Sequence, residues 1–163
     1  MTTLTETKTE TKATAWDATL KGRPAVGAVA LRTRRTSMAD VERFTAMTGD
    51  RNPLHYDAEL AAASPMGGLI VQGGVTTGIL NALVAEDLPG PGTVFLGVEW
   101  TFKKAVKVGE AITGRIEVTS RRDDKPICQL ATSVLNEAGE VCVQGTATTY
   151  TVPLKAAGDG AGP

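Results

Sequence analysis

The chain has 163 residues and a mass of 17.0 kDa, the size of a single domain. Its 17 Lys and Arg residues nearly balance 18 Asp and Glu residues, so the composition gives no reason to expect a nucleic acid or an anionic membrane as a partner. No apolar run is long enough to span a bilayer, and the N-terminus lacks the hydrophobic segment of a signal peptide. We therefore expect a cytoplasmic globular protein.

The two ends of the chain differ in composition from the middle. Residues 1–20 alternate threonine with charged residues, and residues 156–163 are rich in glycine and alanine. Such segments have little apolar surface to bury, which predicts a disordered or loosely docked N-terminal tail and a flexible C-terminal tail. One folded domain is expected between them, over residues 21–155.

The folded part begins with a short apolar run at residues 26–33, which predicts a strand. A helix is expected over residues 38–48, because Ser37 and Asp40 are spaced as in a capping box and Gly49 follows. Its apolar face is predicted to consist of residues at helical spacing: Met38, Val41, Phe44 and Met47.

Two further helices are predicted. Asp57 can cap a short helix over residues 58–63. Residues 69–86 are apolar nearly all round and predict a helix in the centre of the fold. Its glycines Gly73, Gly74 and Gly78 each disfavour a helix by about 0.8–1.0 kcal/mol relative to alanine, so we expect close approach by a ligand or a sheet.

In the second half of the chain, apolar and polar residues alternate with a period of two. Four runs rich in β-branched residues are separated by turn residues and predict strands joined by consecutive hairpins. They cover residues 94–104, 111–123, 125–139 and 140–153. With the early strand and the apolar helix, they predict an α+β domain in which an antiparallel sheet wraps around one helix.

The chemistry points to residues 48–56, TGDRNPLHY, which contain the sole histidine, His55, and a carboxylate, Asp50. Asn52 precedes a proline and favours a turn, so the carboxylate and the imidazole can face one point. Such a pair can hold a water molecule and move its protons. Spacing alone also allows Asp50 to be a solvated loop carboxylate and His55 to be bonded to a backbone carbonyl. A metal site is not expected with one histidine.

Residues 44–64, FTAMTGDRNPLHYDAELAAAS, resemble the signature of the MaoC-like dehydratases, the (R)-specific enoyl-CoA hydratase family. The similarity extends from residue 26 to about residue 153. The matching positions are Gly49, Asp50, Asn52, Pro53, Leu54, His55 and Ser64.

The resemblance implies a hot-dog fold and a homodimer. It places Asp50 and His55 at the catalytic positions that hold water for addition across the 2,3 double bond of an enoyl thioester. Gly73 falls on the glycine whose N–H points at the thioester oxygen, although close packing of helix and sheet also explains a glycine there. The substrate implied is an acyl-CoA thioester, and no cofactor is implied beyond the coenzyme A of that substrate.

Three positions depart from the family pattern. Gln72, Gly73 and Gly74 stand where the family commonly has His-Gly-Met, and Asn81 stands near the acyl pocket where it often has serine. We expect Asn52, Gln72, Gly74 and Asn81 to line the pocket. An unpaired buried amide at Asn81 disfavours a long apolar acyl chain, so a short or polar acyl group is expected.

Other candidates are weaker. Five basic residues could meet the phosphates of coenzyme A but are typical of solvated strand edges. They are Lys103, Lys104, Lys107, Arg121 and Arg122. Cys128 and Cys142 have no second histidine to activate them and are expected to be unreactive. Two other functions stay open: a thioesterase on the same fold, and a non-catalytic acyl-CoA-binding subunit.

Overall fold

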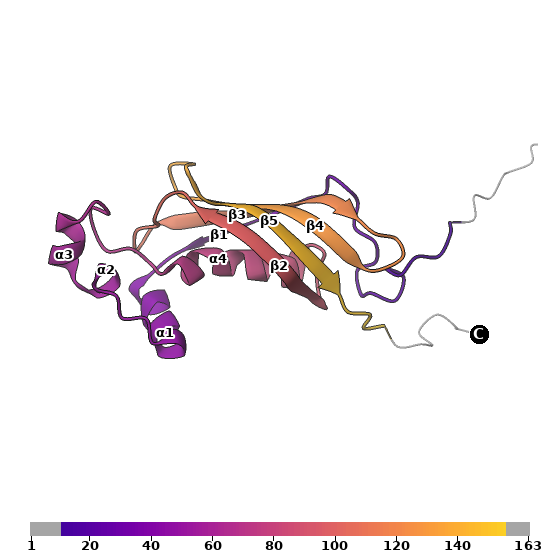
Figure 1. Cartoon of the computed structure of the whole chain (residues 1–163), viewed down its shortest axis with the longest axis horizontal. Helices are drawn as coiled ribbons and strands as arrows, with labels where there is room; N and C mark the ends of the chain where they lie inside the picture. The colour runs from indigo at the N-terminus through magenta and orange to yellow at the C-terminus, as the bar shows by residue number, and fades with distance from the viewer. Residues whose placement is uncertain (1–10, 156–163) are drawn as a thin grey trace, which may run out of the picture.

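A computed structural model describes residues 11–155 as an antiparallel sheet lying against one central helix (Figure 1). The five strands have the order β1-β3-β4-β5-β2. They are β1 (Val29–Arg35), β2 (Thr93–Phe102), β3 (Ala111–Arg121), β4 (Ile127–Leu135) and β5 (Val141–Thr151). This is the expected α+β, hot-dog arrangement. The predictions for residues 1–10 and 156–163 lie outside the described residues.

Alternation along the inner strands sets the register of the sheet. In β3 and β4 every second side chain is buried, among them Ile112, Ile116, Leu130 and Val134. These side chains face the central helix, because successive side chains of a strand point to opposite faces. The prediction that four consecutive strands are joined by hairpins is wrong at one step, since β2 pairs with β5 at an edge of the sheet and does not pair with β3.

The central helix is shorter than predicted. It consists of α4 (Gly73–Ala82), which continues into the π-helical turn η1 (Leu83–Asp87). The preceding residues are extended: Ile70 forms a bridge with Lys107, and Val71 N–H donates to Val106 O at 2.9 Å. A helix from residue 69 is therefore wrong, because an apolar run can bury itself equally well as a strand.

Three short helices lie together beyond one end of the sheet (Figure 1). They are α1 (Met38–Thr48), α2 (Pro53–Tyr56) and α3 (Ala58–Ala63). Both predicted caps are confirmed: Asp40 Oδ2 accepts from Ser37 N–H at 2.9 Å, and Asp57 Oδ1 accepts from Leu60 N–H at 3.0 Å. The buried face of α1 differs from the prediction.

That buried face contains Val41 and Thr45, whereas Met47 is exposed. Phe44 packs against the core as a partly buried side chain. One polar side chain thus occupies an apolar stripe, next to the loop that carries Asp50.

Residues 11–20 belong to the folded unit and not to a tail. The indole of Trp16 is fully buried, and its Nε1–H donates to Arg122 O at 2.6 Å. Ala15 N–H also donates to Asp123 O at 3.0 Å. The expected tail through residue 20 is therefore too long, because one tryptophan supplies enough apolar surface to anchor the segment. Among the described residues no helix is long and apolar enough to cross a membrane.

Candidate active site

The chain reverses direction between α1 and α2 through a series of side-chain hydrogen bonds. Gly49 ends α1 with a φ of 80°, a conformation that favours glycine. Asp50 Oδ1 accepts from Asn52 N–H at 3.1 Å, and Asn52 Oδ1 in turn accepts from Leu54 N–H at 3.1 Å. Asn52 is thus the cap of α2, which is the turn role that the Asn-Pro sequence predicts.

This reversal brings Asp50 and His55 together. Asp50 Oδ2 lies 3.6 Å from His55 Nε2. The distance is longer than a direct hydrogen bond, and it allows one small oxygen-containing group to contact both side chains. The imidazole is buried, with 7% of its side chain exposed, while 40% of the Asp50 side chain is exposed. The pair is therefore anchored at the histidine and open at the carboxylate.

The other ring nitrogen of His55 fixes its orientation. Nδ1 lies 2.7 Å from Ile70 O, and a carbonyl oxygen can only accept, so Nδ1 carries a hydrogen. In the neutral ring, Nε2 is then the acceptor that faces Asp50. The hydrogen bond to a backbone carbonyl that the spacing also allowed for His55 is therefore present. It orients the ring toward the Asp50 carboxylate.

Gly73 is the first residue of α4, after the N-cap residue Gln72. Within residues 11–155 its N–H has no hydrogen-bond acceptor, as is usual for the first turn of a helix. A Cβ on Gly73 would lie 2.9 Å from the Phe102 ring, so packing also favours glycine here. The packing explanation of Gly73 therefore has support, and its contact with a thioester oxygen stays a prediction. The exposed Phe102 ring is the neighbour that could move.

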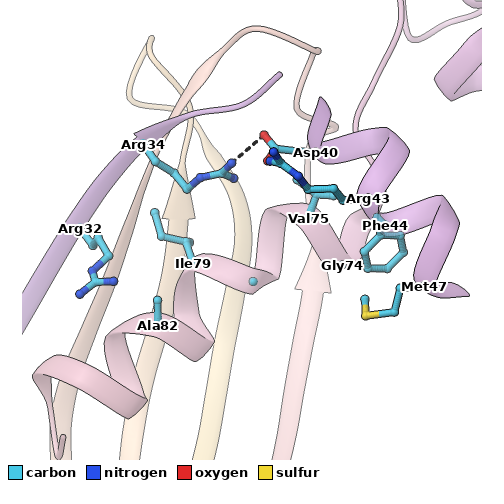
Figure 2. Close-up of a pocket in the computed structure, with 11 residues that line it drawn as sticks. Arg32, Arg34, Asp40, Arg43, Phe44, Met47, Gly74, Val75, Ile79 and Ala82 are labelled. Carbon is cyan, nitrogen blue, oxygen red and sulfur yellow. Dashed lines mark ion pairs between the residues drawn. The ribbon is translucent and has the colours of Figure 1, made fainter. Parts of the chain in front are cut away.

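Two cavities flank the start of α4. The arginine cavity, of about 380 Å³, lies between β1, α1 and α4 (Figure 2). It is lined by Arg32, Arg34, Asp40, Arg43, Phe44, Met47, Gly74, Val75, Gly78, Ile79 and Ala82. The Gly73 cavity, of about 310 Å³, is lined by Met66, Ile70, Val71, Gly73, Thr76, Phe102, Lys103, Lys104, Ala105 and Val106.

The expected pocket residues take different positions. Gly74 lines the arginine cavity, where a Cβ would lie 2.3 Å from the Phe44 ring, so that ring fills the space beside the helix (Figure 2). Gln72 is 1% exposed and lines neither cavity at α4. Asn81 is exposed and also lines neither cavity. In the single chain, Asn81 is therefore not the buried amide that was expected to disfavour a long acyl chain.

The lysine and cysteine candidates differ in their ion pairs and in their burial. Lys104 pairs with Glu140 at 2.6 Å, whereas Lys103 lines the Gly73 cavity and forms no ion pair within residues 11–155. Burial raises the pKa of the Cys128 thiol to about 11, so few thiolates form near neutral pH. Burial also raises the pKa of the Cys142 thiol.

Two residues near the pair were missed by sequence reasoning. The hydroxyl of Thr45 donates to Asp50 O at 2.8 Å, and the hydroxyl of Tyr56 donates to Thr45 Oγ1. The one available signal was a threonine four residues after Val41, on the buried side of α1. A side-chain network that joins distant segments has no periodic pattern by which to predict it.

The sequence and the fold of this chain are similar to those of known proteins. Residues 21–138 match the family model of the MaoC like domain. An (R)-specific enoyl-CoA hydratase of Aeromonas caviae is 38% identical over 122 residues, which cover 75% of this chain and 91% of the relative. A 3-hydroxybutyryl-CoA dehydratase of Methylorubrum extorquens is 32% identical over 134 residues, 82% of this chain and 84% of the relative.

A solved structure of an (R)-hydratase from A. caviae, involved in PHA biosynthesis, superposes with a TM-score of 0.76 at 36% identity. The match covers 79% of this chain and 98% of that chain.

Proposed function

Because this chain belongs to the MaoC-like domain family, we propose that it is a hydro-lyase that adds water across the 2,3 double bond of an enoyl thioester and removes it in the reverse direction. The product expected is the (R)-3-hydroxyacyl thioester. The observation that carries the proposal is the 3.6 Å approach of Asp50 Oδ2 to a buried imidazole whose other nitrogen is fixed by Ile70 O.

The proposed mechanism divides the proton transfers between the pair. Asp50 accepts a proton from the water while the water oxygen bonds to C3 of the substrate. His55 orients the water through Nε2, receives the proton from Asp50 and delivers it to C2, so the water supplies the hydroxyl at C3 and the hydrogen at C2 and both side chains return to their starting forms.

Gly73 supplies the remaining element of the proposal. Negative charge moves to the thioester oxygen as water attacks C3, and an N–H at the start of a helix favours such charge. Loss of one donor of this kind typically raises the barrier by about 2.7–4 kcal/mol. The Gly73 cavity is the space beside this N–H, and we propose that it receives the thioester.

We propose coenzyme A as the carrier, because two of the relatives are named for CoA thioesters. Lys103 lines the Gly73 cavity and forms no ion pair within residues 11–155, so we propose that it contacts a phosphate of coenzyme A. The expected preference for a short or polar acyl group stays a prediction without support from Asn81, which is exposed in the single chain.

The proposed assembly is a homodimer. The edge strand β2 has apolar side chains, among them Val94, Leu96 and Val98, that are roughly half exposed. An edge with free backbone groups and apolar side chains is stabilised by pairing with a second strand. Light scattering after gel filtration tests this: a mass near 34 kDa, about twice 17.0 kDa, is expected. The cytoplasmic location and the lack of a cofactor stay predictions.

The test of function is a panel of trans-2-enoyl-CoA substrates, beginning with crotonyl-CoA and extending to longer chains. Loss of enoyl absorbance with formation of the (R)-alcohol is expected. Release of free thiol with an intact double bond would instead identify a thioesterase. Tight binding of CoA esters without turnover of any substrate would identify a non-catalytic subunit.

A further inference from the structure

Three segments around the candidate site meet at one buried hydroxyl, that of Thr45 in α1. It donates to the backbone oxygen of Asp50 at 2.8 Å and accepts from the hydroxyl of Tyr56. It also accepts from Gln72 Nε2 at 3.2 Å. The partners come from the loop after α1, from α2 and from the residue before α4.

The hydrogen-bonding capacity of this hydroxyl is fully used. A threonine hydroxyl has one hydrogen to donate and two lone pairs to accept with, and the three contacts occupy all of them. Thr45 is 4% exposed, so water competes little for these bonds. A saturated, buried hydroxyl has one orientation, and it holds its three partners at fixed positions relative to one another.

Each partner is a proposed reactive residue or its neighbour in the chain. The Asp50 oxygen belongs to the proposed base itself, Tyr56 directly follows His55, and Gln72 directly precedes Gly73. Resting on the proposed function, we infer that Thr45 is a positioning residue that sets the distances among Asp50, His55 and Gly73 without contacting the substrate.

A purely stabilising role explains this cluster less well. Gln72 Oε1 is buried without a hydrogen-bond partner within residues 11–155. An unpaired buried acceptor is destabilising, and an apolar side chain at this position would avoid that penalty. The role of the amide is therefore to donate hydrogen bonds: Gln72 Nε2 donates to Thr45 Oγ1 and to Val41 O, each at 3.2 Å.

The test compares Thr45→Val with two other variants. Thr45→Val keeps the shape and removes all three bonds, and Thr45→Ser restores the hydroxyl. Thr151→Val is the matched control, because Thr151 is also buried and its hydroxyl pairs with that of Thr93 at 2.8 Å, outside the site. Tyr56→Phe, which removes one bond of the three, serves if Thr45→Val does not fold.

We expect kcat for crotonyl-CoA to fall by about 10²-fold in Thr45→Val with KM little changed, since a displacement of about 1 Å in reacting groups has effects of that size. Thr45→Ser should recover most of the rate, and Thr151→Val should keep it. A folded Thr45→Val with a wild-type kcat, or a loss equal to that of Thr151→Val, would overturn the inference.

A second readout separates this inference from the proposed function. His55 is the one histidine in the sequence, so its imidazole gives a single assignable set of NMR signals. These signals should shift in Thr45→Val and in Tyr56→Phe but not in Thr151→Val. If the signals shift in Thr45→Val but the wild-type protein is inactive on every enoyl thioester, the proposed function is refuted and the positioning role of Thr45 is supported. Unshifted signals in an active protein would refute the positioning alone.

Discussion

The sheet with α4 and the helical end formed by α1 to α3 are held together by different interactions (Figure 1). Fully buried apolar side chains of β3, β4, β5 and α4 form most of the core cluster. From residues 38–63, Val41 alone belongs to its fully buried members. The helical end depends instead on side-chain hydrogen bonds, such as those of Thr45 and the bond between His55 and Ile70.

This difference shows where stability and chemistry reside. Apolar packing is non-directional and tolerates small shifts, whereas a hydrogen bond fails over a few tenths of an ångström. A pair such as Asp50 and His55, which must meet at a set distance, gains precision from directional contacts. We therefore expect substitutions in the sheet to lower mainly the stability of the fold, and substitutions in the helical end to lower mainly the reaction rate.

The largest expected effect is that of Asp50→Asn in the helical end. The amide keeps the shape and still accepts from Asn52 N–H, but it cannot take a proton from water. The rate of crotonyl-CoA hydration should fall by about 10²–10⁴-fold, the usual contribution of a general base. Asp124→Asn is the control, because Asp124 is exposed in the turn between β3 and β4. Near-wild-type turnover in Asp50→Asn would remove Asp50 from the mechanism.

The second prediction concerns Leu130→Ala in the sheet. Leu130 is fully buried in β4, so truncation should lower the free energy of unfolding by about 2–5 kcal/mol. The kcat of the folded fraction should stay within about twofold, because the site depends on other contacts. Urea denaturation and initial rates measure the two effects, and Leu31→Ala on the exposed face of β1 is the matched control. A large loss of kcat in Leu130→Ala would break the separation of the two regions.

The same division determines what could be predicted from sequence. Alternation predicted β3 and β4 because burial on one face imposes a period of two. The caps of α1 and α3 were predictable, because Ser37, Asp40 and Asp57 act within three residues of themselves. The pairing of Asp50 with His55 was an expectation from a local motif and a turn.

Features that depend on distant contacts were missed or misplaced. The extended residues before α4 have the composition of a buried helix, and their pairing with residues 106–108 decides between the two structures. Trp16 is hydrogen-bonded to the turn after β3, more than 100 positions away in the chain. The bond from Gln72 to Thr45 joins residues 27 apart, and nothing in the local sequence indicates it.

A smaller effect is expected from Asp40→Asn, where the helical end joins β1. Partial burial of the carboxyl opposes ionisation, but hydrogen bonds from Arg34 and Ser37 outweigh it and hold the pKa of Asp40 below its usual value. A lowered pKa means that the charged form stabilises the fold above the unfolded pKa and that this contribution is lost as the pH falls through the folded pKa.

The substitution should therefore lower the free energy of unfolding by about 1 kcal/mol near neutral pH, the size of a typical N-terminal cap. The difference from wild type should shrink in acid, once the pH falls below the lowered pKa of Asp40, because both chains are then neutral at this position. Urea midpoints near neutral pH and in acid measure it. A difference that persists unchanged in acid would show that the charge of Asp40 is not what stabilises the junction with Arg34.

The smallest expected effect is a gain, in Gly78→Ala on α4, which borders both regions. Nothing lies within 4 Å of a Cβ placed on Gly78, whereas Phe44 occupies the corresponding space at Gly74. Alanine in a helix interior should raise the free energy of unfolding by about 0.5–1 kcal/mol. Gly78 lines the arginine cavity, so the rate adds a second measurement. An unchanged rate would confine catalysis to the Gly73 side of the helix, whereas a slower but more stable enzyme would show that the arginine cavity takes part in the reaction cycle.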